Sequence, residues 1–199
     1  MQSCKDFFIN YNKMLGQILK DNHFIEIEKI TKFLIKAIKQ KKRVFVCGNG
    51  GSASVANHFI CDFNKGIKYS SKKKMIPQII SLTNSIELIT AISNDIKFEE
   101  IFTSQLENYS KKNDVIIIIS SSGKSKNILN VLKYATLKNL SIISLIGFGK
   151  NNYVKNASNY YINLNTKNYG LTEDIFQSIM HMISQYIRAS NLKTRSEIL

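Results

Sequence analysis

The chain has 199 residues, of which 44% are hydrophobic and 21% are charged. This length suits one domain with a sizeable core, and the composition excludes a disordered or fibrous protein. Cysteine occurs at Cys4, Cys47 and Cys61, an odd number that makes no disulfide framework. Free cysteines suit a reducing compartment, so we expect a cytoplasmic protein.

The net charge is +14, and lysine supplies most of it because the arginines are only Arg43, Arg188 and Arg195. The lysine runs are short, at 41–43 and 72–74, and the remaining lysines are scattered. Proteins that bind nucleic acids more often cluster arginine with exposed aromatic residues. The longest apolar runs are far shorter than the roughly 20 residues of a membrane helix. We therefore expect neither nucleic acid nor a membrane as partner, and only some steering of anionic small substrates.

Apolar residues recur at helical spacing in two stretches within residues 4–41, which predicts two helices that meet near residue 21. Beyond them, short apolar runs alternate with helical patterns. The runs predict strands at 44–47, 78–82, 114–119, 141–146 and 160–164, and the patterns predict helices at 52–63, 85–93, 98–109, 124–138 and 172–189. Strands that are apolar throughout indicate a parallel sheet covered on both faces.

We therefore expect an α/β fold, a doubly wound five-stranded parallel sheet of flavodoxin-like type, with the N-terminal helical pair packed against it. The whole chain is expected to form a single domain. It comprises the N-terminal helices at 1–41, the α/β core at 42–190 and a tail at 191–199.

Two turns that follow strands carry residues suited to an anion. Ligands of such sheets bind at the carboxyl ends of strands, where helix N-termini point free N–H groups outward. The first turn has the sequence GNGGSAS from Gly48, and the second has SSSGKS from Ser120. Glycines let the backbone approach an anion, and serines can donate to it or cap a helix. Either turn alone could be merely structural, but two in one sheet indicate a phosphate site.

The chain has three histidines. His23 falls in the break between the N-terminal helices, and we expect it at the surface. His58 and Asp62 are four residues apart, so one helix face presents both. Glu173 and His181 share the last helix. Two histidines with carboxylates can hold zinc or act as an acid–base pair, although a helical surface pair and a buried histidine would give the same pattern.

The ordered set GNGGSA, ISND at 92–95, SSSGKS and a histidine on the last helix resembles the sugar isomerase (SIS) domain. Within that family the chain is most similar to the phosphoheptose isomerases, over nearly its whole length. The resemblance implies an aldose–ketose isomerase that converts sedoheptulose 7-phosphate to D-glycero-D-manno-heptose 7-phosphate. It also implies heptose biosynthesis for lipopolysaccharide or capsule, and a homotetramer with active sites between subunits.

The resemblance also assigns site residues. The substrate-binding residues are implied to be Asn49, Gly50, Gly51, Ser52, Asn94, Asp95, Ser120, Ser121, Ser122, Ser125 and Glu173. The zinc ligands are implied to be His58, Asp62, Glu173 and His181, and Asp62 and His181 are implied to be catalytic.

The sequence departs from the family at several positions in and next to this set of residues. Asp62 replaces a glutamate, Glu173 replaces a glutamine, Phe176 replaces a histidine, and Lys124 adds a cation beside the serines. These departures keep an alternative open, namely a SIS protein that binds a sugar phosphate or a protein partner without turnover.

Overall fold

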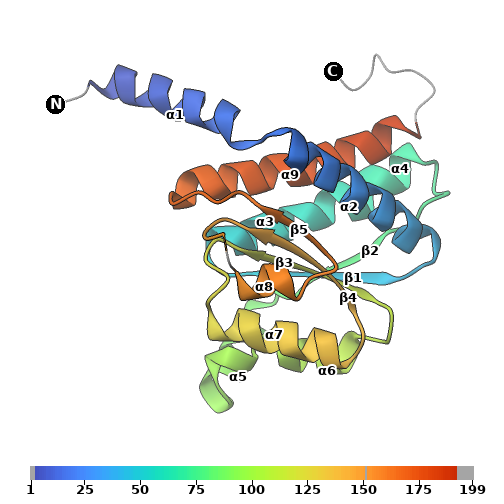
Figure 1. Ribbon diagram of the computed structural model, residues 1–199. Coiled ribbons are helices and arrows are strands. Elements are labelled where there is room, and N and C mark those ends of the chain that lie inside the picture. Colours follow the sequence, from blue (N-terminus) through green and yellow to red (C-terminus); the bar gives the residue numbers. More distant parts are fainter. Residues whose placement is uncertain (1–2, 151, 192–199) are drawn as a thin grey trace.

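The structure is a computed structural model that describes residues 3–150 and 152–191. Five strands form one parallel sheet in the order β2-β1-β3-β4-β5 (Figure 1). The strands are β1 (Arg43–Gly48), β2 (Gln78–Ser81), β3 (Val115–Ser120), β4 (Ser141–Ile146) and β5 (Tyr160–Asn163). Each predicted strand is present with both ends within one residue of its expected position, and the doubly wound α/β fold is confirmed.

The common direction of the strands gives the sheet two different edges. The turns that follow the strands lie at one edge, here called the carboxyl edge, and the turns that precede them lie at the opposite amino edge. In Figure 1 the carboxyl edge is at the left and the amino edge is at the right.

Helices cover both faces of the sheet (Figure 1). The first layer contains α2 (Asp21–Lys39), α3 (Gly51–Ile60), α4 (Lys68–Ser70) and α9 (Tyr169–Ala189). The second contains α5 (Ile86–Asp95), α6 (Thr103–Tyr109), α7 (Lys126–Leu137) and α8 (Tyr153–Asn156). Each layer has its own apolar core, and β3 contributes to both, because Ile117 faces one and Ile118 the other. This two-sided burial explains why the strands read as unbroken apolar runs.

Helix α1 (Cys4–Ile18) projects from the body of the molecule toward the carboxyl edge (Figure 1). It has no buried residue, and Phe7 and Phe8 are 56% and 66% exposed. The Tyr11 hydroxyl donates a 2.7 Å hydrogen bond to Asp174 on α9, and this bond, with smaller contributions from burial and neighbouring carboxylates, raises the pKa of Tyr11 to about 12. The expectation that both N-terminal helices pack on the sheet is therefore correct for α2 and wrong for α1.

His23 is buried, so the expectation of a surface histidine is wrong. Its side chain is 8% exposed, and its Nδ1 accepts a hydrogen bond of 3.1 Å from the Lys20 N–H. Its Nε2 lies 3.2 Å from the carbonyl oxygen of Asn163, the last residue of β5. The ring thus fixes the start of α2 against the sheet through a contact between residues far apart in the sequence.

Two further expectations concern the chain as a whole. None of the helices within the described ranges is long and apolar enough to cross a membrane. The division of the chain at residues 41 and 190 stays a prediction, and the predicted tail lies outside the described residues from 192 onward.

The Asp114 carboxylate, just before β3, is hydrogen-bonded to Arg43 at the start of β1. This contact leads to a prediction about the stability of the fold. The carboxylate accepts hydrogen bonds from the Arg43 N–H, the Arg43 Nε and the Lys111 N–H, at 3.1, 3.0 and 2.9 Å. Replacement by alanine leaves a half-buried guanidinium and two N–H groups without this acceptor. Asp114→Ala should therefore lower the free energy of unfolding by about 2–3 kcal/mol in urea titrations. Glu107→Ala, at an exposed carboxylate on α6, is the control, and an equal effect of both changes would contradict the assignment.

Candidate functional site

The two turns predicted to bind an anion lie side by side at the carboxyl edge. They follow β1 and β3, which are neighbours in the sheet. The first turn is tight because Gly50 has φ of +56°, a conformation that favours glycine. Its Asn49 side chain exchanges two hydrogen bonds of 2.9 Å with Asn127, a fully buried residue in the first turn of α7. This pair of amides locks the glycine turn to the helix that follows the serine loop.

Two helices begin at these turns without a side-chain cap. Neither Gly50 before α3 nor Ser125 before α7 provides a capping hydrogen bond among the described residues. The first N–H groups of a helix need partners from outside the helix, and they carry its positive dipole end. At the start of α3, the Ser52 and Ala53 N–H groups already bond to the Asn49 and Gly50 carbonyls, at 3.1 and 2.9 Å. The start of α7 is therefore the better candidate for binding a phosphate.

The serine loop is held by its own hydroxyl oxygens. The Ser120 Oγ accepts a 2.9 Å hydrogen bond from the Gly123 N–H, and the Ser122 Oγ accepts a 3.3 Å hydrogen bond from the Lys124 N–H. Ser120 is buried, as is Ser121. Because a hydroxyl that accepts a bond still has a proton to donate, both serines remain able to bind an oxyanion.

The start of α9 closes the third side of this region. The Glu173 carboxylate lies directly against Gly51, at the point where any larger residue would place its Cβ atom. The neighbouring Thr172 side chain lies in the same way against Gly147, the residue that follows β4. The glycines thus allow α9 to approach the strand ends closely, and a negative charge stands beside the first turn.

Three side chains from α3, the segment after it and α9 converge into a cluster that could hold a metal ion. One ligand atom from each of His58, Asp62 and His181 lies within 4.8 Å of the others. The two histidine Nε2 atoms are 3.0 Å apart. The Asp62 oxygens lie 3.8 Å from the His58 Nε2 and 3.5 Å from the His181 Nε2. The imidazoles are about half exposed, so the cluster is open to a ligand.

These separations fit a tetrahedral zinc site. Ligands at the usual 2.0–2.1 Å from zinc are about 3.3 Å from one another. Two histidines and a carboxylate with a further position left open are also the ligand pattern of catalytic zinc sites. The Gln177 amide adjoins the cluster, with its Nε2 3.0 Å from the His181 Nε2. Among the described residues this is the one group of histidines, cysteines and carboxylates with such spacing.

A π-helix (Cys61–Ile67) delivers Asp62 to the cluster. The predicted helix 52–63 is regular only as far as Ile60, and its wider continuation changes the direction of the side chains that follow. The Ser184 hydroxyl on α9 donates a 3.3 Å hydrogen bond to Asp62. Asp62 is thus positioned by the π-helix on one side and by α9 on the other.

The Asn64 side chain fixes this π-helix to the sheet. Its amide nitrogen donates a 2.8 Å hydrogen bond to the Ile79 carbonyl, and its amide oxygen accepts a 3.0 Å hydrogen bond from the Ile79 N–H. On the other side, Gly66 lets the aliphatic part of Arg188 on α9 pack within 3.3 Å of where a Cβ would lie. The Asp62 backbone is therefore held between β2 and α9.

Some predicted site residues are not brought to the cluster. The Glu173 carboxylate lies at Gly51. Glu173 is eight positions from His181 on the same helix, which is about 12 Å along the helix axis, so its side chain does not join the cluster. Asn94 and Asp95 end α5, on the opposite face of the sheet from α9, and both are exposed. The Asn94 amide donates a 2.8 Å hydrogen bond to Asp95. Within one chain, these two side chains are separate from the metal cluster.

Three residues with clear roles in the site were not assigned from the sequence: Gln177, Asn127 and Asn64. Gln177 had a signal, because it is four residues from His181 on one helix face. Asn127 and Asn64 act through partners 78 and 15 residues away, which no local pattern shows.

The chain is similar to known proteins in sequence and in fold. Residues 6–147 match the family model of the SIS domain. The chain is 39% identical over 132 residues to a phosphoheptose isomerase from Clostridium acetobutylicum, an alignment that covers 66% of each chain. It is 40% identical over 114 residues to a phosphoheptose isomerase from Helicobacter pylori, with 57% of this chain and 58% of that one covered. The chain thus spans somewhat less than two thirds of these relatives.

The fold is that of a solved phosphoheptose isomerase from Francisella tularensis. The two structures superpose with a TM-score of 0.79 over 94% of this chain and 98% of the other. Their sequences are 23% identical, so this likeness establishes the fold.

The two Asn64 hydrogen bonds generate a prediction about the support of Asp62. Asn64→Ala leaves the Ile79 N–H and carbonyl without their side-chain partners, so the free energy of unfolding should fall by about 2 kcal/mol. Urea titrations measure this, with Asn108→Ala at an exposed position of α6 as the control. If Asn64→Ala were as stable as the control, Asn64 would not anchor the π-helix.

Proposed function

The chain belongs to the SIS-domain family, and from this premise we propose that it is an aldose–ketose isomerase of sugar phosphates. The proposed reaction converts sedoheptulose 7-phosphate to D-glycero-D-manno-heptose 7-phosphate. The observation that carries the proposal is the cluster of His58, Asp62 and His181, in a chain whose α7 begins without a side-chain cap directly after the serine loop. The identity to phosphoheptose isomerases supports the choice of substrate.

We assign the phosphate to the serine loop. Ser120, Ser122 and Ser125 can donate hydroxyl protons there, and the N–H groups of α7 add the positive end of its dipole. Ser121 contributes its backbone, and the exposed Lys124 adds a positive charge. Asn49, Gly50, Gly51 and Ser52 in the first turn are proposed to hold the sugar.

Zinc is the proposed cofactor. His58, Asp62 and His181 would hold it, because their separations match those of tetrahedral ligands. For the fourth position, the resemblance favours Glu173, and the geometry favours the Gln177 amide. When bound, zinc polarises a carbonyl group and so favours loss of a proton from the adjacent carbon.

The chemistry requires a base and an acid near one carbon–carbon bond. A 2-ketose becomes an aldose when a proton leaves C1, an enediol forms, and a proton returns to C2. We assign Asp62 as the base at C1 and His181 as the group that moves protons between the sugar oxygens. The Ser184 hydroxyl holds the Asp62 carboxylate in place by donating to it. Glu173, against Gly51, is proposed to contact the sugar as well, and its charge would keep the phosphate out of the first turn.

A homotetramer is the proposed assembly. Leu15 and Ile18 at the end of α1 pack partly against the core, whereas Phe7, Phe8, Ile9 and Met14 are exposed. A large exposed apolar patch marks an interaction surface. Asn94 and Asp95 are proposed to reach the sugar bound by a neighbouring copy, because they are exposed and lie on the other face of the sheet.

We propose a cytoplasmic enzyme of heptose biosynthesis, serving lipopolysaccharide or capsule. All three cysteines are unpaired, and burial raises the pKa of the Cys47 thiol well above its ordinary value. Cys4 and Cys61 are exposed, and free thiols of this kind persist in a reducing compartment. The intact cluster favours an enzyme over a non-catalytic sugar-phosphate sensor, which would not need an acid–base pair.

The assignment of Asp62 and His181 predicts a graded set of activities. With sedoheptulose 7-phosphate and zinc, the wild-type protein should form aldose phosphate. Asp62→Asn and His181→Gln should each lower kcat by about a hundredfold or more. Asp62→Glu should retain or raise activity, because it restores the family's longer side chain.

Glu107→Gln, an exposed carboxylate on α6, is the control for this series. Full turnover by Asp62→Asn would exclude Asp62 as the base and make Glu173 the candidate. A wild-type protein that binds sugar phosphate but forms no aldose phosphate with zinc would support the sensor instead.

The serine loop yields a prediction that separates binding from stability. Ser120→Ala with Ser122→Ala should raise the Kd for sugar phosphate at least about tenfold, because two donors to the anion are lost. The free energy of unfolding should fall by about 1–2 kcal/mol, since each oxygen accepts one backbone N–H bond. Titration calorimetry and urea unfolding measure the two effects, with Ser104→Ala on α6 as control. Unchanged binding would place the phosphate elsewhere.

A further inference from the structure

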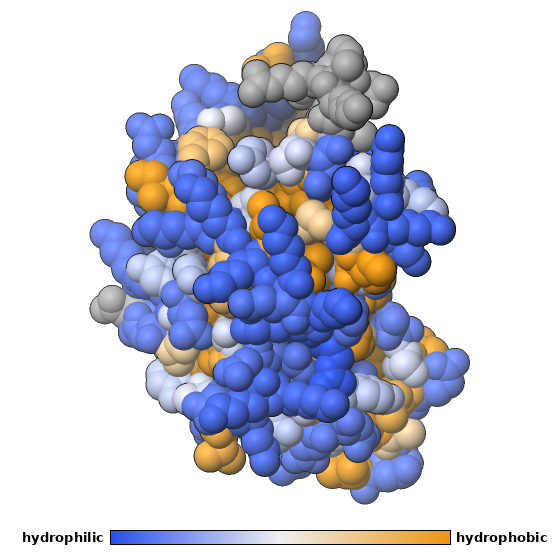
Figure 2. All heavy atoms as spheres, turned by 90° about the vertical axis from the view of Figure 1, so that its right-hand side faces the viewer, coloured by the Kyte–Doolittle hydropathy of each residue, from blue (hydrophilic) through white to orange (hydrophobic). Residues whose placement is uncertain are grey.

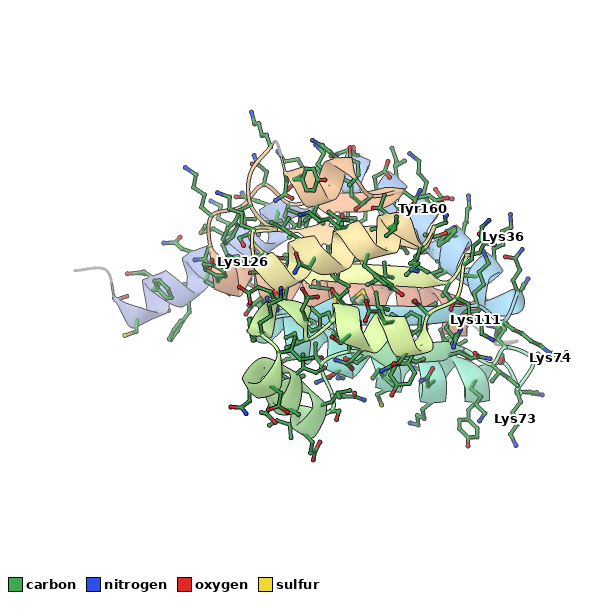
Figure 3. The ribbon with its side chains drawn as sticks, turned by 90° about the horizontal axis from the view of Figure 1, so that it is seen from below. Lys36, Lys73, Lys74, Lys111, Lys126 and Tyr160 are labelled. Carbon is green, nitrogen blue, oxygen red and sulfur yellow. The ribbon has the colours of Figure 1, made fainter. Side chains whose placement is uncertain are left out.

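Three lysine runs that are far apart in the sequence meet at the amino edge. Lys41–Lys42 precede β1, Lys72–Lys74 precede β2, and Lys111–Lys112 precede β3. These strands are neighbours in the order β2-β1-β3, and adjacent strands lie about 4.8 Å apart. Figure 3 shows Lys36, Lys73, Lys74 and Lys111 together at this end of the molecule. Lys36 belongs to α2, and the other three belong to the loops before β2 and β3. We call these residues, with Lys39 and Lys138, the lysine edge.

The charge of the lysine edge is not compensated. No lysine of the edge forms an ion pair with a carboxylate in the part of the chain that the structure describes. Of the carboxylates in the segments that lead into these strands, Asp114 is bound by Arg43, and Glu107 is exposed without an ion pair there. Hydrophilic residues cover the middle of the face seen in Figure 2, which looks at the amino edge. The surface is therefore strongly positive and free to meet an anionic partner.

Exposed aliphatic side chains adjoin the lysines. Ile76 follows Lys72–Lys74 and is 53% exposed, and Leu137 precedes Lys138 and is 75% exposed. Lysines beside exposed aliphatic groups suit the surface of a bilayer, where anionic headgroups meet the ammonium groups and the acyl boundary accepts the aliphatic ones. A nucleic acid offers no comparable environment for Ile76 or Leu137. Arg43 at this edge is paired through its Nε with Asp114, so the unpaired charge of the edge comes from lysines, which bind phosphates as point charges.

We propose that the lysine edge docks on the surface of a membrane that contains anionic phospholipids. This surface contact needs no membrane-spanning segment. It departs from the expectation of no membrane partner, which stays a prediction. Because the lysine edge lies opposite the carboxyl edge, the glycine turn and the serine loop stay open to water while the molecule is bound. The proposal is independent of the reaction assigned to that site.

The experiment measures binding of the full chain to vesicles by cosedimentation. Vesicles of phosphatidylcholine alone are compared with vesicles of phosphatidylcholine and phosphatidylglycerol. The wild-type chain should bind only the second kind and should be released as salt is raised. Each lysine near an anionic surface contributes about a fivefold effect, so Lys36→Glu, Lys74→Glu and Lys111→Glu together should lower affinity by about a hundredfold or more.

A matched variant controls for net charge. Lys5→Glu, Lys150→Glu and Lys167→Glu carry the same change in charge, but they lie on α1 or in turns at the carboxyl edge. This variant should keep most of the binding. Circular dichroism confirms that both variants fold, and isomerase activity of the lysine-edge variant shows separately whether the site is intact.

Three results would overturn the proposal. They are no binding to anionic vesicles by the wild-type chain, equal loss of binding in both variants, and equal binding to both kinds of vesicle. Labelled duplex DNA is tested in parallel. If the wild-type chain bound DNA through the lysine edge but did not bind the vesicles, the partner would be nucleic acid.

Discussion

All five strands of the sheet run in one direction, and the two ends of the molecule differ in chemistry for that reason. Each helix that follows a strand begins at the carboxyl edge, so the positive ends of α3, α7 and α9 meet there. The same rule gathers the segments that precede the strands at the amino edge. A glycine turn, a serine loop and the start of α9 lie at the same edge because the strands that lead to them are parallel.

Much of this architecture can be read from the sequence. Strands buried on both faces need apolar residues at every position, and β3 meets that need with a run of isoleucines. The glycine at position 50 also has a local explanation, because its φ is positive and this conformation favours glycine. The features that the sequence did not reveal depend on distant partners. His23 is buried by a contact with the end of β5, and α1 lacks a place on the sheet because α2 and α9 occupy it.

The candidate site shows the same division between local and distant causes. Helical spacing placed His58 and Asp62 on one face, and the structure brings both to His181. Spacing could not show that the helix widens at Cys61, because the anchor of that change is the pair of bonds between Asn64 and β2. Nor could it show that Glu173 packs on Gly51, a contact between two elements that are separated by most of the chain.

Helix α1 has a consequence for how the folded state depends on the amount of protein. None of its 15 residues is fully buried, and the Tyr11 bond to Asp174 is the side-chain hydrogen bond that joins it to the body among the described residues. An isolated helix of this length is marginal in water, so in the proposed homotetramer neighbouring copies would supply most of its stability. Its helical content is then a function of concentration, and dilution would unwind α1 before it disturbed the sheet. In that assembly, the helical content of α1 would report the fraction of chains that are assembled.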